Sequence, residues 1–352
     1  MNSASASMIV PPDKLHDIVR TIFSAAGSTD REARLVADHL VEANLRGHDS
    51  HGVGMIPTYI ANARDGSLIL NQTLSVGFDS ASLVVLDGGL GIGQVMAHDA
   101  IEAGIERAAN AGACIVGLRN SHHIGRIGHW AEQCAAAGLV SIHFVNVVST
   151  PAVAPFGGTK ARVGTNPFAV GIPRAGEPPI IVDFATSRLA AGKVHVAFNK
   201  GVSLPEGALL DAGGHPTTDP SALFSDPPGA LLPFGEHKGW GLSVACELLG
   251  AALIGGKTQS GPKQGNAIVN SMLSILVSPD RLGTRANLDD ETDAFVSWAR
   301  SEATRTAQIL MPGDPERETK RWREANGIPI DARTWEEIEA AAESVGARGA
   351  PA

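Results

Sequence analysis

The sequence predicts an α/β protein, and three observations support this fold class. Short apolar runs typical of buried strands alternate with segments whose apolar residues recur at helical spacing. The chain has 352 residues, which exceeds the usual size of a single core and favours two lobes around a cleft. A hydrophobic content of 43% is enough to fill such cores. We therefore expect a globular protein with a ligand site between lobes.

Two helices are predicted at the start of the chain. Between residues 14 and 26, apolar side chains recur on one helical face, and Gly27 ends the helix. Thr29 and Glu32 have the spacing of a capping box at the start of a second helix. This second helix leads directly into residues 48–51 and therefore determines the orientation of that segment.

The α/β alternation follows a linking region that begins after Pro57. Strands are expected at residues 81–86, 114–118, 139–145 and 180–182. Helices are expected at residues 94–111, before Ala137, and after the last of these strands. Residues 201–233 are rich in glycine and proline, which predicts long surface loops.

The last part of the chain is predicted to be helical. An apolar helix is expected at residues 238–254. Charged helices are expected to begin at residues 314–315, where aspartate precedes proline, and at a capping box over residues 334–337. We expect these late helices to pack on the two N-terminal helices.

Composition and charge limit the partners of the protein. A net charge of −9 without long blocks of like charge argues against binding to nucleic acids or anionic membranes, which requires a basic face. Three cysteines in apolar surroundings favour reduced thiols of the core and a cytoplasmic location. The sequence has no apolar stretch long enough for a membrane helix, and its first ten residues resemble a frayed tail more than a secretory signal. A small-molecule ligand is therefore expected.

Residues 88–93 read GGLGIG and lie between a predicted strand and a predicted helix. A Rossmann dinucleotide-binding turn has this location, but it requires a third glycine three residues after the second. Gln94 and Met96 occupy the two positions where that glycine would stand. We therefore interpret this segment as a tight turn, and any nicotinamide cofactor must bind elsewhere.

Two short segments concentrate the reactive side chains. Residues 46–52 read RGHDSHG and residues 119–126 read RNSHHIGR, and together they contain four of the twelve histidines. The pKa of imidazole lies near neutrality, so histidines grouped with arginine, serine and glycine indicate acid/base chemistry on a small anion.

Six segments resemble the malate/L-lactate dehydrogenase family, the sulfolactate dehydrogenase-like group of nicotinamide oxidoreductases. These segments are LRGHDSHGV at 45–53, NSHHIG at 120–125, PFGG at 155–158, GTNP at 164–167, VDFATS at 182–187 and HKGWG at 237–241. The resemblance runs in order from about residue 15 to residue 338. Within the family, both histidine segments are most similar to hydroxycarboxylate dehydrogenases of the B type.

The resemblance implies a non-Rossmann fold, in agreement with the glycine spacing. It implies a nicotinamide cofactor-binding α/β domain with a mixed sheet over residues 81–284. A helical domain would consist of residues 1–80, completed by about 285–352. The resemblance also implies a homodimer with its active site near the subunit interface.

His51 and His123 are the candidate catalytic residues that the resemblance implies. Reduction of a 2-oxo acid delivers hydride to the carbonyl carbon, and negative charge grows on the oxygen. An imidazolium within hydrogen-bond reach supplies the proton and lowers that barrier. We expect both rings to line the substrate and favour His123 as the acid/base, because its glycine-bounded loop follows a strand.

Substrate contacts are expected from both histidine segments and from a later polar pair. The candidates are Arg46, His48, Ser50, Arg126, Thr165 and Asn166. Many family members carry an arginine at the position of Met55, and a planar arginine is the preferred partner of a carboxylate. Here Arg46 or Arg126 must supply that contact, unless Arg126 holds a cofactor phosphate. The change also suggests a wider apolar pocket that tolerates larger side chains, aryl groups included.

The resemblance implies NAD or NADP as the cofactor and leaves the choice between them open. The residues that it assigns to the cofactor are Gly125, Arg126, Ile127, Ser149, Ile181, Val182, Asp183, Phe184, Ala185, His237, Lys238, Gly313, Asp314, Pro315 and Glu316. Asp183 follows a buried strand and can accept a hydrogen bond from a ribose hydroxyl. Residues 237–238 begin an apolar helix whose amides and dipole favour a pyrophosphate.

Three alternatives remain open. Within the same family, the substrate could be a cyclic imine carboxylate instead of a 2-oxo acid. A metal-dependent hydrolase or hydratase would use His48 with His51, and His122 with His129, yet the chain has no HExxH motif and no cysteine-ligand spacing, so we expect no metal. A non-catalytic binding protein would require both histidine segments to be vestigial.

Overall fold

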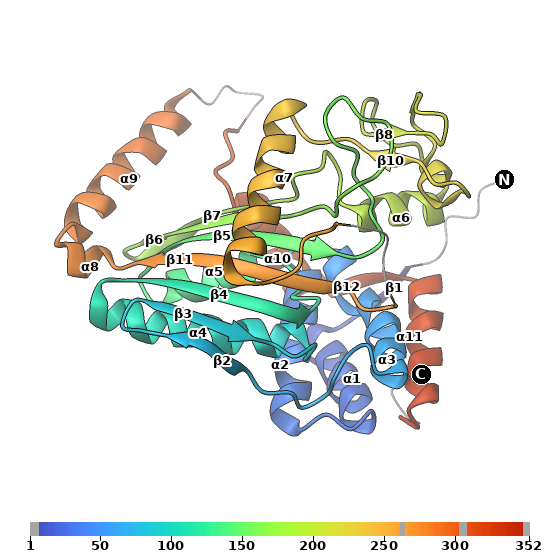
Figure 1. The fold of residues 1–352 in the computed structure, drawn as a ribbon, viewed down its shortest axis with the longest axis horizontal. Helices are drawn as coiled ribbons and strands as arrows, with labels where there is room; N and C mark the ends of the chain where they lie inside the picture. Colours follow the sequence, from blue (N-terminus) through green and yellow to red (C-terminus); the bar gives the residue numbers. More distant parts are fainter. Residues whose placement is uncertain (1–6, 261–264, 303–307, 348–352) are drawn as a thin grey trace.

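A seven-stranded sheet forms the centre of the computed structural model, which describes residues 7–260, 265–302 and 308–347 (Figure 1). In spatial order, its strands are β2 (Ser75–Asp79), β3 (Leu83–Asp87), β4 (Ala113–His122), β11 (Val269–Val277), β5 (Val140–Val148), β6 (Phe168–Arg174) and β7 (Glu177–Phe184). β3 and β4 pair in parallel, and the other neighbours in this sheet are antiparallel. The sheet is therefore mixed, unlike the parallel sheet of a Rossmann fold.

Helices cover both faces of this sheet (Figure 1). α4 (Gly93–Ala111) and α5 (Gly128–Ala136) pack on one face, and α7 (His237–Gly250) packs on β5 from the other. Two consecutive residues of β4 show the alternation: Val116 approaches Gly104 of α4, while Gly117 approaches Ile254, just after α7. The sheet therefore separates two packed layers.

The N-terminal helices are α1 (Pro12–Ala25) and α2 (Asp30–Leu45), close to their predicted bounds. The predicted capping box forms only in part. Thr29 Oγ1 accepts a hydrogen bond from the Glu32 amide at 3.4 Å, but the Glu32 carboxylate binds Ser28 and the backbone of Asn71 instead of the Thr29 amide. The prediction of a linking region after Pro57 was wrong for its first part, where α3 (Ile56–Asp65) forms.

Two late helices pack against the N-terminal part of the chain. α10 (Asp314–Asn326) packs on α2, as predicted, whereas α11 (Ala332–Ser344) packs mainly on α3 and not on the two N-terminal helices. The N-cap of α11 is Asp331, which accepts from the Thr334 amide at 3.0 Å, so the predicted capping box at residues 334–337 was placed one turn too late. α9 (Arg285–Ser301) lies apart from both, and its Val296 packs with Ile180 of β7. The division into domains near residues 80 and 285 stays a prediction.

The glycine- and proline-rich region 201–233 contains more structure than the predicted loops. After α6 (Ala191–Lys200), the short strands β8 (Leu209–Leu210), β9 (Pro216–Thr217) and β10 (Ala230–Leu231) form a small sheet. Leu209 and Leu231 are buried against Val153 and Val194, because this region has a small core of its own. A further pair joins β1 (Ser7–Val10) to β12 (Ile328–Asp331), so part of the predicted frayed tail is a strand.

The remaining elements are short. They are η1 (Asp49–His51), η2 (Val53–Met55), η3 (Pro220–Phe224), η4 (Ala252–Ile254) and α8 (Pro279–Leu282). All three cysteines are free and buried, as predicted. Burial raises the pKa of Cys134 and of Cys246 to about 12, so both thiols stay protonated at neutral pH. Of the helices described, none has the length and apolar character needed to cross a membrane.

Candidate active site

The structure brings the two histidine segments together. His51 ends η1, just after α2, and His123 follows the end of β4. Their ring centroids are 5.7 Å apart and the rings are inclined by only 22°, so the imidazoles are stacked. Both line one cavity of about 470 Å³. Two segments remote in the chain therefore present a pair of imidazoles to the same space.

The first histidine segment is held by hydrogen bonds from two helices. Asn44, near the end of α2, donates to Asp49 Oδ1 at 2.7 Å and accepts from the Val53 amide at 2.8 Å. Arg323 of α10 binds both carboxylate oxygens of Asp49, with Nη1 2.6 Å from Oδ1, and also donates to the Asn44 carbonyl. These contacts fix the backbone that carries His51.

The second segment turns at Gly125, whose φ of +73° lies in the left-handed region. A Cβ at this position would stand 2.1 Å from His39 Nε2. That nitrogen accepts a hydrogen bond of 2.9 Å from the Arg126 amide, while Asn270 of β11 accepts one from the Ile124 amide. The turn that presents His123 is therefore tied to α2 and to the central strand of the sheet.

Replacing Gly125 with alanine should lower the free energy of unfolding by roughly 2–4 kcal/mol, because a strained φ and a steric contact add. The matched control is Gly157→Ala, since Gly157 has a φ of +83° but no atom within 4 Å of its would-be Cβ. That variant should lose about 1 kcal/mol. Urea unfolding measures both, and equal losses would refute the contact with His39.

His123 has a defined partner on the side away from the cavity. Its Nδ1 lies 2.6 Å from the hydroxyl of Tyr59, the single tyrosine of the chain, and Gln94 Nε2 donates to that hydroxyl at 2.9 Å. A phenol hydroxyl can donate or accept, so it can pair with Nδ1 in either protonation state of the ring. This contact leaves Nε2 of His123 for a ligand.

Both imidazoles are neutral in the ligand-free protein. Burial lowers the pKa of His51 to about 3, and the positive charges of His48, Arg126 and Lys193 act in the same direction. Burial also lowers the pKa of His123 well below its usual value, and a charge on His51 would lower it further. The rings therefore become protonated at neutral pH only if a ligand brings negative charge beside them.

Most of the predicted site residues line this cavity or a neighbouring one of about 340 Å³. The larger cavity is lined by His48, Ser50, His51, His123, Gly125, Arg126, Ile127, Ser149, Thr165, Asp183, Phe184, Ala185 and Glu316. The smaller one is lined by Arg126, Ile181, Val182, Asp183, Phe184, Gly313, Pro315 and Glu316. The two cavities share Arg126, Asp183, Phe184 and Glu316 and form one branched site.

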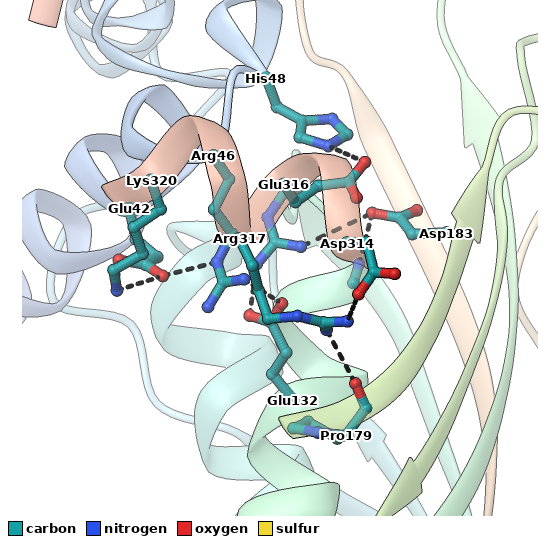
Figure 2. Close-up of polar contacts among 12 residues, drawn as sticks. Glu42, Arg46, His48, Glu132, Pro179, Asp183, Asp314, Glu316, Arg317 and Lys320 are labelled. Carbon is teal, nitrogen blue, oxygen red and sulfur yellow. Dashed lines mark hydrogen bonds and ion pairs between the residues drawn. The ribbon is translucent and has the colours of Figure 1, made fainter. Parts of the chain in front are cut away.

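Arg126 stands at the junction and is only 2% exposed. Its Nη2 lies 2.5 Å from Glu132 Oε2, and its Nη1 lies 3.9 Å from Asp183 Oδ2. Arg46 binds the same Glu132 at 3.1 Å and also Glu42 at 2.6 Å (Figure 2). Both arginines that were expected to hold a substrate carboxylate therefore already face carboxylates of the protein.

Glu132, Asp183 and Glu316 line the smaller cavity, and Figure 2 shows their polar contacts. Glu316 lies 3.5 Å from His48 Nε2, and Asp183 Oδ2 accepts from the Gly128 amide at 2.8 Å. Asp314 binds Arg317 at 2.5 Å and Arg300 at 2.8 Å. Arg317 Nη1 also donates to the Pro179 carbonyl at 2.9 Å, which ties the start of α10 to β7.

Five predicted residues line neither cavity. They are Arg46, Asn166, His237, Lys238 and Asp314. Asn166 is buried and accepts from the Val147 amide at 3.0 Å while donating to Glu247 at 2.9 Å, so its side chain supports the cavity wall from behind. The His237 ring packs against Phe156, with 6.0 Å between centroids.

Sequence reasoning missed several residues that line or support the cavity. Asn270, Arg188 and Lys193 line it, and Tyr59 and Gln94 hold His123 from behind. Tyr59, the single tyrosine of the chain, follows His51 by eight residues and could have been recognised from the sequence as a candidate partner of the histidines. No sequence pattern indicated the others.

The walls of the branched site suit a dinucleotide. Arg126 Nε is buried and has no hydrogen-bond partner within the described residues, so a donor remains for an added group. At Gly313, with a φ of +91°, a Cβ would approach Arg317 Nη1 to 2.7 Å and narrow the smaller cavity. Asp183 reaches both cavities and can accept from a sugar hydroxyl.

Comparison with known proteins places the chain in one family. Residues 10–339 match the malate/L-lactate dehydrogenase family. Hydroxycarboxylate dehydrogenase B from Escherichia coli K12 is 48% identical over 94% of this chain and 93% of its own length. A Δ1-pyrroline-2-carboxylate/Δ1-piperideine-2-carboxylate reductase from Pseudomonas putida is 33% identical over 98% of this chain and 99% of its own length.

The solved structure of sulfolactate dehydrogenase from Methanocaldococcus jannaschii has a TM-score of 0.86 and 31% identity. The match covers 96% of this chain and 98% of that one. The predicted sulfolactate dehydrogenase-like fold is therefore confirmed.

Proposed function

Because this chain belongs to the malate/L-lactate dehydrogenase family, we propose that it transfers hydride between NAD or NADP and a 2-oxo or 2-hydroxy carboxylic acid. The observation that carries this proposal is the stacked pair of His51 and His123 in one cavity. A carbonyl that accepts hydride needs a proton donor at its oxygen, and this pair supplies one.

The cofactor, when bound, would supply the hydride donor or acceptor. Of the residues assigned to it, Arg126 has an unpaired Nε and Asp183 a carboxylate toward both cavities, which supports their role. Ile181 and Phe184 would cover its apolar parts, and Gly313 leaves room before α10. Turnover measured with NAD and with NADP in separate reactions would decide between the two cofactors.

The protein supplies positioning and proton transfer. His123 Nε2 would hold the proton that the substrate oxygen receives, while Tyr59 keeps the ring oriented through Nδ1. His51, with its Nδ1 3.0 Å from Ser50 Oγ, would orient the same oxygen from the other side. Both rings are half-buried at the cavity wall, so a bound substrate would cover them, exclude water from the reacting atoms and strengthen their electrostatic effect.

A second candidate is reduction of a cyclic imine carboxylate. The similarity to the Pseudomonas putida reductase over nearly the whole chain favours it. The chemistry is closely related, since hydride again reaches a carbon double-bonded to a heteroatom next to a carboxylate. The two candidates separate in one assay, in which reduced nicotinamide is mixed with a panel of 2-oxo acids and with Δ1-piperideine-2-carboxylate.

That assay tests the proposal as a whole. Loss of the near-ultraviolet absorbance of reduced nicotinamide with a 2-oxo acid, unaffected by a chelator, is the expected result. Turnover of the imine and of no 2-oxo acid would show that the second candidate is the correct function. Absence of turnover with every substrate, together with no binding of either cofactor, would refute both. The homodimer and the cytoplasmic location stay predictions of the resemblance and of the reduced cysteines.

The two directions of the reaction should depend differently on pH. Reduction requires a protonated histidine, and the pKa of His51 is about 3 in the free protein, with that of His123 also lowered. Above that pKa the protonated fraction falls about tenfold per pH unit, so kcat/KM for reduction should fall about tenfold for each pH unit between 5.5 and 8.5. Oxidation requires the neutral ring, so its kcat/KM should stay flat. A plateau for reduction below pH 6.5 would contradict the lowered pKa.

A further inference from the structure

The larger cavity contains an unassigned cation beside the histidine pair. Three cationic side chains line it: Arg126, Arg188 and Lys193. A substrate carboxylate buried there needs one of them, because an isolated buried charge is very costly. Met55, which also lines the cavity, is apolar and cannot pair with a carboxylate.

Arg126 is already neutralised. Its guanidinium lies between Glu132 and Asp183, and it is almost fully buried. A substrate carboxylate placed beside it would meet two carboxylates of the protein at short range. Like charges at that range repel each other and raise the cost of binding.

Arg188 is directed elsewhere. Its Nη1 donates to the Gly207 carbonyl at 3.3 Å, and a Cβ on Gly207 would lie 2.7 Å from that nitrogen. The guanidinium therefore already has a partner in the loop before β8. Arg188 and Lys193 are both exposed side chains at the wall of the cavity, so their partners and not their exposure distinguish them.

Lys193 differs from both. It lies in the first turn of α6, and that turn sits directly on the first histidine segment, since a Cβ on Gly192 would stand 2.3 Å from Ser50 Cβ. Within the described part of the chain, its ammonium has no hydrogen bond and no ion pair. Its charge reaches the ring of His51, whose pKa it lowers. It is thus a cation next to the reacting groups with all its donors available.

We propose that Lys193 binds the carboxylate of the substrate, with Met55 forming the apolar wall beside it. This inference rests on the proposed function and names the specificity-determining residue of that site. A lysine is a point charge on a flexible stem, whereas arginine demands a planar bidentate geometry. The site should therefore accept 2-oxo acids whose carboxylates enter at different angles.

The binding of the carboxylate would also explain how the histidines become protonated. With its charge paired to a carboxylate, Lys193 no longer repels a proton on His51. The bound carboxylate and Lys193 together carry no net charge, so Lys193 no longer disfavours protonation of His51. Substrate binding and proton uptake are coupled in this arrangement.

Lys193→Met is the test, with Lys193→Arg as the charge-conserving variant and Arg188→Met as the matched control. The probe is oxamate, an unreactive analogue of a 2-oxo acid, and its Kd is measured by calorimetry in the presence of reduced nicotinamide. Loss of a charge-assisted hydrogen bond should raise the Kd for oxamate and the KM for 2-oxo acids about 10- to 100-fold in Lys193→Met. Lys193→Arg should stay within about tenfold of the parent, and Arg188→Met within about threefold.

The outcomes distinguish this inference from the proposed function. If the parent turns over a 2-oxo acid but Lys193→Met binds oxamate as the parent does, the role of Lys193 is refuted and the function stands. If Arg188→Met shows the larger loss, the carboxylate binds there instead and the inference fails. If the parent neither binds oxamate nor turns over any substrate of the panel, both proposals fail. Unchanged cofactor affinity and thermal unfolding of each variant would show that the fold is retained.

Discussion

Replacing His123 with asparagine should lower kcat by about 10²- to 10⁴-fold, the usual yield of general acid/base catalysis. Asparagine retains a polar group near Tyr59, so the hydrogen bond behind the ring can be replaced in part. It cannot carry a proton to the substrate oxygen. Single-turnover measurement with reduced nicotinamide and a 2-oxo acid separates the chemical step from product release.

Two further variants make this prediction specific. Tyr59→Phe removes the partner of Nδ1 but leaves the imidazole, so its kcat should lie between those of the parent and of His123→Asn. Cofactor affinity, measured by fluorescence, should be nearly unchanged in both, because the proton donor is not expected to hold the dinucleotide. If His123→Asn retains turnover within a few-fold of the parent, His123 is not the acid, and His51→Asn becomes the variant to examine.

Lowering the pH from 7.5 to 5.5 should destabilise the protein by roughly 4 kcal/mol through three histidines with lowered pKa values alone. Burial lowers the pKa of His51, His129 and His143 to about 3 in the folded chain, against 6.5 in the unfolded chain. The stability due to a lowered histidine pKa is complete above 6.5 and is lost as the pH falls toward 3. Each ring contributes about 1.4 kcal/mol over this interval. Burial of His39 and His123 acts in the same direction.

Urea unfolding at the two pH values measures this loss. The ordinary pKa values of carboxyl groups lie below the interval, so histidines dominate the change. His143 does not line the cavity and is bonded to Ser274 of β11 and to Ser141 of its own strand, β5; His143→Gln should reduce the loss of stability by about 1.4 kcal/mol. His215→Gln, at an exposed ring, should leave it unchanged. An unfolding midpoint that is equal at both pH values would disprove the burial of neutral rings.

Local patterns predicted the helices well. α1 buries the five apolar side chains on its predicted face, and α4 ends at Gly112 with a φ of +91°. Both features depend on residues within a few positions of one another, so the sequence contains all the relevant information.

β11 shows why part of the sheet could not be predicted. This central strand contains Asn270, Ser271 and Ser274, and polar residues interrupt the apolar run that would indicate a buried strand. Asn270 accepts from the Ile124 amide, and Ser274 binds His143. These partners lie more than a hundred residues away in the chain, so the polar residues are explained only by the folded structure.

The candidate site shows the same limit. Its two histidine segments are recognisable in the sequence, but the partners of their neighbours are not. Glu132 binds Arg126 from the same region of the chain and Arg46 at the end of α2, so both arginines already face a carboxylate of the protein. Lys193 stands in an unremarkable helical turn, and its position depends on the close approach of Gly192 to Ser50.

The ion pair between Arg323 and Asp49 has a consequence for biosynthesis. The residue that braces the first histidine turn is made long after the turn itself, since α10 begins only at Asp314. While a ribosome is still extending the chain short of α10, Asp49 lacks its guanidinium partner. The first histidine segment can therefore be braced by Arg323 only after α10 has been translated.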